Sequence, residues 1–181
     1  TVNTPSASAP ICAGETVNLN ALNPSVSTDP GTFTWYRGDP QTNPFAVQLT
    51  TALASAAQLI DGTTYFCGFT DALTGCTNYT SVTYTVNALP VLTPPIISPG
   101  VCRGSTFDLT TLEAGLTAEA GTFTWYEGDP AAGGTQVANP MMVSPTVAND
   151  TYCAVFTANS TNCSNKVCIT FNIDPLPVLN A

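Results

Sequence analysis

The ten residues GTFTWYRGDP at positions 31–40 decide the fold of this chain, because they return almost unchanged as GTFTWYEGDP at positions 121–130. Within each copy, apolar Phe and Trp alternate with Thr, which is the period of a strand that buries one face. The Gly-Asp-Pro triplet that closes the motif is typical of a turn. Each copy therefore predicts a strand and a turn, with Trp35 and Trp125 facing a core.

The similarity between the copies spreads outward until it covers nearly the whole chain. Residues 11–17 (ICAGETV) match residues 101–107 (VCRGSTF) at the same offset of 90, and the tetrapeptide LPVL ends both copies. Tandem copies of this size predict two domains, residues 1–90 and 91–181. The Pro-rich stretch LPVLTPP at residues 89–95 is expected to form a short, stiff linker.

Composition excludes several classes of function. Of the 181 residues, 44% are hydrophobic, and 3 Lys and Arg face 12 Asp and Glu, which gives a net charge of −9. This charge repels phosphate, so nucleic acid is not an expected partner. The chain has no histidine, and the usual acid/base groups of an enzyme are missing. We expect no enzyme activity, no cofactor, no bound metal and, because polar residues interrupt every apolar run, no membrane-spanning helix.

Alternation of apolar and polar residues predicts further strands in both halves and almost no helix. Val17, Leu19 and Ala21 alternate with polar residues and predict an early strand. Helical spacing occurs only around residues 52–59, where we expect a short turn. Among the other alternating runs, inward positions expected in the two cores include Tyr65 and Tyr152.

The order of these elements resembles the immunoglobulin fold, in which a Trp-bearing strand is followed by a strand that begins D-x-x-x-Y-x-C, here DGTTYFC ending at Cys67. The closer resemblance is to tandem immunoglobulin-like repeats of secreted and surface proteins of Bacteroidetes-type bacteria, such as gliding adhesins and modules associated with sorting domains. The matching motifs are CAGETVNL at 12–19, TWY at 34–36, TY at 64–65 and GC at 75–76.

This resemblance implies an all-β chain of two tandem immunoglobulin-like Greek-key β-sandwiches, located outside the cell or at its surface. It also implies a structural or adhesive role, in which the sandwiches form a rigid, disulfide-stabilised rod within a surface protein or filament. The alternative is a polysaccharide- or protein-binding domain of a secreted protein.

Four of the seven cysteines recur in both copies, Cys12 with Cys102 and Cys76 with Cys163. Their joint recurrence favours the bridges Cys12–Cys76 and Cys102–Cys163 within the domains. In plain immunoglobulin topology, however, these sites lie at opposite ends of the sandwich. Either the first strand is placed differently, or this pairing is wrong.

Each of the other three cysteines has no cysteine at the equivalent position of the other copy. Cys153 and Cys168 flank the last hairpin and fall opposite each other when the turn is centred near residues 160 and 161, which predicts a cross-strand disulfide. Cys67 faces inward and has Leu19 or Ala21 at the site where an antibody domain has its partner cysteine. We therefore expect Cys67 to be a buried free thiol.

Candidate contact residues are few. Trp35 and Trp125 have the inward parity of core residues rather than of sugar-stacking platforms. Tyr36 and Tyr126 point outward and are better candidates for contact with a ligand. Calcium at the Gly-Asp-Pro turns is disfavoured, since no D-x-D-x-D-G spacing occurs; the aspartates considered for it are Asp39, Asp61, Asp71, Asp129 and Asp150.

The expected partners are other copies of the chain or adjacent repeats, arranged head to tail, and surface polysaccharide. Residues 1–10 are an extended segment, and LPVL at the end of the chain repeats the linker motif. An extended segment can add to the edge of another subunit's sheet. The alternative is that the neighbouring domain is covalent, within a longer protein.

Overall fold

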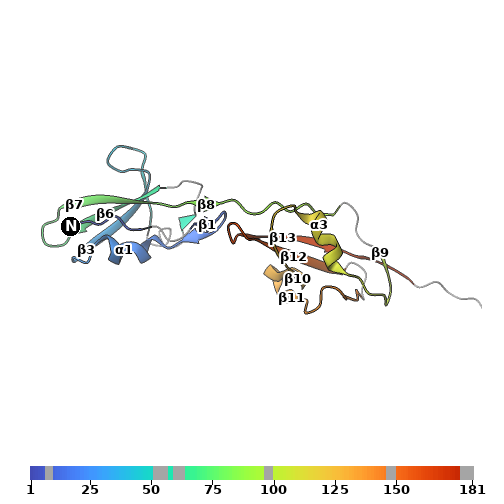
Figure 1. Ribbon diagram of the computed structural model, residues 1–181. Helices are drawn as coiled ribbons and strands as arrows, with labels where there is room; N and C mark the ends of the chain where they lie inside the picture. Colours follow the sequence, from blue (N-terminus) through green and yellow to red (C-terminus); the bar gives the residue numbers. More distant parts are fainter. Residues whose placement is uncertain (7–9, 51–56, 59–63, 96–99, 146–149, 176–181) are drawn as a thin grey trace, which may run out of the picture. The chain divides into compact units, whose positions relative to one another are not determined.

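The computed structural model describes residues 1–6, 10–50, 57–58, 64–95, 100–145 and 150–175. The chain divides into two compact units, Thr1–Ala88 and Leu89–Ala181. This division lies two residues ahead of the domain boundary expected from the sequence. Each unit is a sandwich of short and long strands, and each is described on its own (Figure 1).

The main sheet of the first unit has four antiparallel strands in the order β4-β3-β6-β7. These are β4 (Val47–Gln48), β3 (Gly31–Arg37), β6 (Thr64–Asp71) and β7 (Thr77–Thr83). Trp35 lies opposite Cys67, and Tyr65 lies opposite Val82, so the inward residues of neighbouring strands form one continuous layer. The chain leaves this sheet after β4 and returns beside β3, which is a Greek-key connection.

The second layer of the first unit is built from two pairs of short strands. β2 (Thr16–Val17) pairs antiparallel with β5 (Ala57–Gln58), whereas β1 (Ile11–Cys12) pairs parallel with β8 (Val86–Asn87). A parallel pair formed by the first and last strands, beside a four-stranded antiparallel sheet, gives the unit its immunoglobulin-like sandwich topology.

The second unit repeats this arrangement. Its main sheet has the order β11-β10-β12-β13, from β11 (Thr135–Gln136), β10 (Gly121–Glu127), β12 (Thr151–Ala158) and β13 (Ser164–Thr170). β9 (Gly100–Cys102) pairs parallel with β14 (Asn172–Asp174), and Phe107 forms an isolated antiparallel bridge with Val143. A short 3-10 helix, η3 (Pro130–Ala132), follows β10. The fold is thus two tandem immunoglobulin-like β-sandwiches, as the sequence predicted.

The predicted early strand is wrong beyond residue 17. The chain instead turns into a 3-10 helix, η1 (Leu19–Leu22), and a single helical turn, α1 (Asn23–Val26). Leu19 and Val26 are fully buried and Leu22 packs against the same cluster, so the spacing i, i+3, i+7 faces the core. The second unit has the same element in η2 (Leu109–Leu112) and α3 (Glu113–Leu116). Of the turn expected around residues 52–59, only Ala57 and Gln58 lie among the described residues, and they form β5.

The core predictions are confirmed. Trp35, Trp125, Tyr65 and Tyr152 are each at most 3% exposed, and the helical turn covers the tryptophan in both units. The Trp35 Nε1–H donates to Asn23 Oδ1 at 2.9 Å, and the Trp125 Nε1–H donates to Glu113 Oε1 at 2.9 Å. Each indole therefore buries its ring and still satisfies its one polar group.

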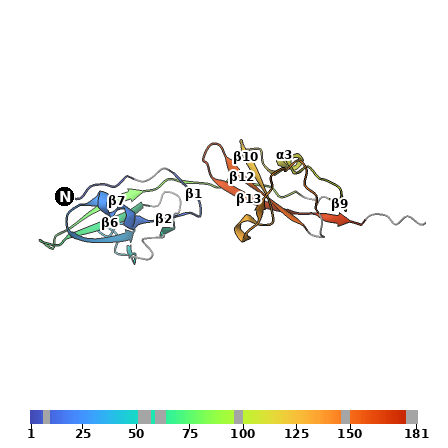
Figure 2. The same ribbon diagram turned by 90° about the horizontal axis from the view of Figure 1, so that it is seen from below.

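In each unit, the first segment runs alongside the last two strands and in the same direction as the last one. In the first unit, Thr4 contacts Thr80 and Ile11 pairs with Val86. Thr1 contacts Asp29, and Figure 2 shows the N-terminus at the end of the unit away from β1. In the second unit, Asn165 donates to the Pro90 carbonyl, and Gly100 pairs with Asn172. The chain therefore enters each sandwich at one end and leaves it at the other.

Candidate functional site

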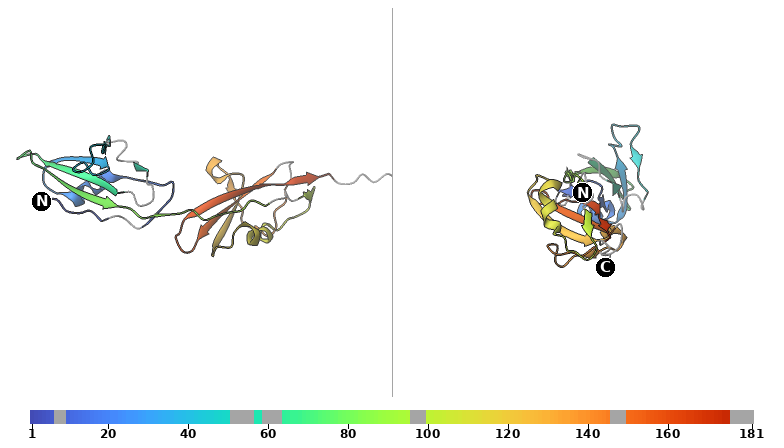
Figure 3. Two further views of the ribbon diagram at one scale, coloured as in Figure 1. Left: turned by 90° about the horizontal axis from the view of Figure 1, so that it is seen from above. Right: turned by 90° about the vertical axis from the view of Figure 1, so that its right-hand side faces the viewer.

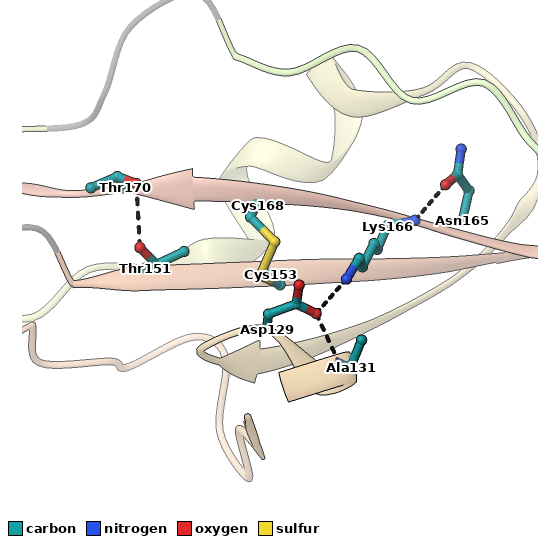
Figure 4. Close-up of a disulfide and its surroundings, with 8 residues drawn as sticks. All are labelled: Asp129, Ala131, Thr151, Cys153, Asn165, Lys166, Cys168 and Thr170. Carbon is teal, nitrogen blue, oxygen red and sulfur yellow. Dashed lines mark hydrogen bonds and ion pairs between the residues drawn. A yellow bond between two sulfur atoms is a disulfide. The ribbon is translucent and has the colours of Figure 1, made fainter. Parts of the chain in front are cut away.

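A disulfide lies on the outer face of the second unit's main sheet. Cys153 and Cys168 occupy directly opposed positions on β12 and β13 and are bonded to each other, which confirms the predicted cross-strand bridge. Figure 4 shows the bridge beside an ion pair between Lys166 Nζ and the Asp129 carboxylate. The Lys166 ammonium and the Ala131 amide both donate to Asp129, and they lower the pKa of this carboxyl group.

The predicted bridges Cys12–Cys76 and Cys102–Cys163 are wrong. Cys76 and Cys102 are free, exposed thiols, whereas Cys12 and Cys163 are disulfide-bonded. Strand geometry gives the reason. Cys12 lies beside Asn87, and the chain from Cys76 to Asn87 runs along β7 and β8, a path of roughly 36 Å at about 3.3 Å per residue. A disulfide requires Cα atoms within about 7 Å.

The second unit has the same separation between its two recurring positions. Cys102 lies beside Asp174, and β13 and β14 carry the chain from Cys163 to that residue. Within a unit, the two recurring cysteines therefore lie at opposite ends of the sandwich. This is the arrangement that plain immunoglobulin topology requires, and it excludes the predicted pairing.

Cys67 is a buried free thiol, as predicted. It is 0% exposed, belongs to the first core and lies opposite Trp35. Burial raises the pKa of the Cys67 thiol to about 12, against a smaller opposing effect of a backbone hydrogen bond at Thr34. The thiol therefore stays protonated at neutral pH, and its packing role outweighs any chemistry.

The outer face of the first unit's main sheet has a pair of tyrosines over a glycine. Tyr36 and Tyr79 approach with ring centroids 6.4 Å apart. A Cβ on Gly68 would lie 2.9 Å from the Tyr79 ring and 3.6 Å from the Tyr36 ring, so the glycine is what admits both side chains. Burial raises the pKa of Tyr36, and Tyr79 adds to this effect.

The strand register surrounds these rings with hydroxyl groups. The outward residues carry no charge, and two threonine pairs are hydrogen-bonded across strands, Thr64 with Thr83 at 2.7 Å and Thr70 with Thr77 at 2.8 Å. The described outward positions on β3, β6 and β7 form an aromatic-hydroxyl face: Thr32, Thr34, Tyr36, Thr64, Phe66, Gly68, Thr70, Thr77, Tyr79, Ser81 and Thr83.

The corresponding face of the second unit is different. Tyr126 lies opposite Cys153, so the candidate contact tyrosine stands beside the disulfide rather than beside a second ring. Val155 and Lys166 pair at the positions that Gly68 and Tyr79 occupy in the first unit. The sequence predicted Tyr36 but not Tyr79. A signal existed, since Tyr79 lies two residues from Ser81 and has the same outward parity.

Two of the aspartates considered for calcium accept hydrogen bonds within their own turns. Asp39 accepts from the Gln41 amide at 2.9 Å and from the Thr42 hydroxyl at 2.8 Å. Asp71 accepts from the amide and the hydroxyl of Thr74, and these bonds lower its pKa. These carboxylates therefore act as turn acceptors. Asp61 lies outside the described residues.

None of the helices in the part of the chain that the structure describes is long and apolar enough to cross a membrane.

No protein-family model and no curated protein matches the sequence. Among solved structures, the chain is similar to a three-Ig fragment of titin, with 13% identity, 95% of this chain and 64% of that chain covered, and a TM-score of 0.32. It is also similar to the N-terminal four Ig domains of Dscam1 isoform 6.9, with 11% identity, 80% and 38% covered, and a TM-score of 0.31.

The titin domains z1z2 in complex with telethonin give 13% identity, 98% and 97% coverage and a TM-score of 0.27. The chain spans less than two thirds of the length of the Dscam1 chain and of the three-Ig titin chain. The fold assignment follows from the strand order and register of each unit, not from these likenesses.

Proposed function

We propose that this chain is an extracellular structural and adhesive module of a bacterial surface protein or filament. One observation carries the proposal: each sandwich takes in the chain at one end and releases it at the other, with its first segment lying along its last two strands. Domains with this path join in series without doubling back. Neighbouring domains, or other copies of the chain, are then met head to tail.

Two further features support this proposal, one bearing on the extracellular location and one on contact between neighbouring domains. The chain contains the Cys153–Cys168 disulfide, of which Cys168 is exposed on the outer face of its sheet, and such bonds persist in oxidising compartments rather than in a reducing cytosol. Only 8% of residues are charged, and hydroxyl side chains cover the outer face of the first main sheet, so strong charge repulsion between neighbouring domains is limited.

Surface labelling of the source cells tests this proposal. Intact cells are treated with a membrane-impermeant label that reacts with amines, or with a protease. Peptides of this chain are then identified by mass spectrometry. We expect modification or cleavage in intact cells, at the level seen after lysis. Peptides protected in intact cells and modified only after lysis would contradict the proposal.

The aromatic-hydroxyl face favours a second function, binding of a neutral polysaccharide. Paired rings stack on the apolar faces of sugars, and the surrounding hydroxyl groups can hydrogen-bond to them without a charge to desolvate. Glycan-array binding followed by calorimetry tests this function. We expect binding to be lost in Tyr36→Ala and in Tyr79→Ala and kept in Tyr126→Ala, which alters the outer face of the second unit. Equal loss in all three variants would contradict a site on the first unit.

A further inference from the structure

The four recurring cysteines fall at two kinds of position, and the local structure at each kind is the same in both units. The first kind is the strand-end position, Cys12 and Cys102. The carbonyl of Cys12 accepts from the Glu15 amide at 3.1 Å, and that of Cys102 accepts from the Ser105 amide at 3.0 Å. Each cysteine ends a short strand that pairs parallel with the last strand of its unit.

The second kind is the turn position, Cys76 and Cys163. The carbonyl of Cys76 accepts from the Asp71 amide at 3.1 Å, and that of Cys163 accepts from the Ala158 amide at 3.0 Å. In each turn the cysteine amide donates to the threonine hydroxyl two residues earlier, at 3.3 Å for Cys76 and 3.2 Å for Cys163. The hydrogen bonds made by the backbone of the cysteine therefore correspond in the two turns.

One member of each kind already carries a disulfide. Cys12 at a strand end and Cys163 at a turn are disulfide-bonded, whereas Cys102 and Cys76, their equivalents, are free and exposed. Both kinds of position are thus suited to disulfide formation, and within a unit the two kinds are too far apart to bond to each other. The two free thiols are one of each kind.

The two free thiols lie at opposite ends of the chain's path, one at the entry to the first unit and one at the exit from the second. Cys76 lies where the chain enters the first unit, because the neighbouring Ala72 donates to Pro30 at 2.9 Å and Thr1 contacts Asp29. Figure 3 shows this turn at the end of the first unit that bears the N-terminus. Cys102 lies where the chain leaves the second unit, paired with Asp174 on β14.

We propose that Cys102 of one copy and Cys76 of a second copy form an intermolecular disulfide that links the copies head to tail. The exit end of one copy's second unit then meets the entry end of the next copy's first unit. The same turn also presents Leu73, which is 94% exposed, and contact with a second copy would cover it. The inference rests on the proposed function for the order in which the ends meet. Because the two surfaces differ, the linkage propagates instead of closing.

Disulfide exchange supplies the chemistry. The Cys102 thiolate attacks a disulfide donor, either oxidised glutathione or the disulfide of a thiol oxidase, and one donor sulfur leaves as a thiolate. The Cys76 thiolate of the second copy then attacks the Cys102 sulfur of the mixed disulfide, and the second donor sulfur leaves. The two thiol protons pass to the two released sulfurs. One protein disulfide forms, and one donor disulfide is reduced.

Oxidation of the purified full chain tests the proposal. The protein is incubated with oxidised and reduced glutathione and analysed by non-reducing electrophoresis and peptide mass spectrometry. We expect a ladder of covalent oligomers that dithiothreitol collapses, with cross-linked peptides that contain Cys76 and Cys102. Cys67→Ala should leave the ladder unchanged, because the buried thiol takes no part.

Single variants separate this linkage from its rivals. Cys76→Ser alone and Cys102→Ser alone should each remain monomeric, whereas an equimolar mixture of the two should give dimers and nothing larger. Dimers of either variant alone would show pairing of like cysteines and overturn the proposal. The proposal would also be overturned if the wild-type chain stayed monomeric while both thiols became oxidised, or if no ladder of oligomers formed.

Labelling of intact source cells, combined with the redox state of Cys76 and Cys102, distinguishes failure of this inference from failure of the proposed function. A chain that is labelled on intact cells but keeps both thiols reduced would overturn the linkage and leave the extracellular role standing. A chain protected inside the cell would overturn the proposed function, and the purified protein would still report on the linkage.

Discussion

Each indole nitrogen is satisfied by a side chain twelve residues earlier, on the helical turn that covers the tryptophan. Glu113→Ala removes the acceptor of Trp125 and should destabilise the second unit by about 1 kcal/mol, the usual net contribution of one hydrogen bond. Glu113→Gln keeps the Oε1 acceptor and should cost much less. Urea unfolding followed by tryptophan fluorescence measures both variants. Equal losses would show that the charge of Glu113, not its hydrogen bond, matters.

Asp129 should make stability depend on pH. Its pKa is lowered in the folded chain by Lys166 and the Ala131 amide, so the unfolded chain takes up the proton first as pH falls. The stabilisation is complete above the ordinary carboxyl pKa of about 3.9 and is lost as pH falls below it. The urea midpoint of the second unit should therefore drop between about pH 5 and the folded-state pKa. Lys166→Met should make that drop smaller, and an unchanged drop would contradict the assignment.

Contacts between residues close in sequence could be predicted from the sequence, whereas contacts between distant residues could not. The Cys153–Cys168 pair was predictable, because a hairpin brings its own two strands into register. The environments of Cys76 and Cys102 were not, because they depend on which end of the sandwich each strand reaches. The Tyr36–Tyr79 contact needs the register of three strands and a glycine between them.

At the scale of elements, alternation predicted strands well where both neighbours are strands. Trp35, Tyr65 and Val82 all face inward as expected. The alternation gave a wrong strand prediction at residues 19–26. Leu19 has strand spacing from Val17, but it also has helical spacing from Leu22 and Val26, and the chain forms helical turns there. Pro24, near the start of the helical turn, was the available signal.

The glycine that begins the repeated strand should tolerate no side chain. A Cβ on Gly31 would overlap the Thr70 carbonyl oxygen and the Phe69 ring, and Gly121 meets Thr157 and Phe156 in the same way. Gly31→Ala and Gly121→Ala should each destabilise their unit by about 1–3 kcal/mol, the usual cost of overpacking. Thermal unfolding by calorimetry measures this cost.

Gly115 in α3 is the matched control, because a Cβ added there would meet no atom within 4 Å. Gly115→Ala should stabilise the second unit by about 0.5–1 kcal/mol, since alanine favours a helix over glycine. A loss of stability in this variant comparable to that of Gly121→Ala would show that any added methyl group is harmful, and would remove the steric explanation.

At the scale of the whole molecule, the two sandwiches differ in one covalent bond, because the second main sheet has a cross-strand disulfide where the first has Phe66 and Ser81. Cys153 and Cys168 close a separation of 15 residues, for which chain entropy predicts about 3 kcal/mol of stabilisation. A variant with serine at both positions should unfold at lower urea concentration in the second unit. The first unit, with Phe66 and Ser81 at these positions, should keep its midpoint. A shared shift would mean that the units unfold together.

A pull on the two ends of either sandwich would load its parallel strand pair lengthwise. Because β1 enters from one end and β8 leaves by the other, opposing forces slide the strands past each other and strain their bridging hydrogen bonds together. These bonds include Ile11 N–H to Thr85 at 3.2 Å and Ala13 N–H to Asn87 at 2.8 Å. Ile11→Pro removes the first donor. Single-molecule stretching of the reduced chain, in which the disulfide at Cys12 carries no load, should show a lower rupture force for the first unit alone. In the surface module proposed above, this strand pair would be the element that resists the force of flow.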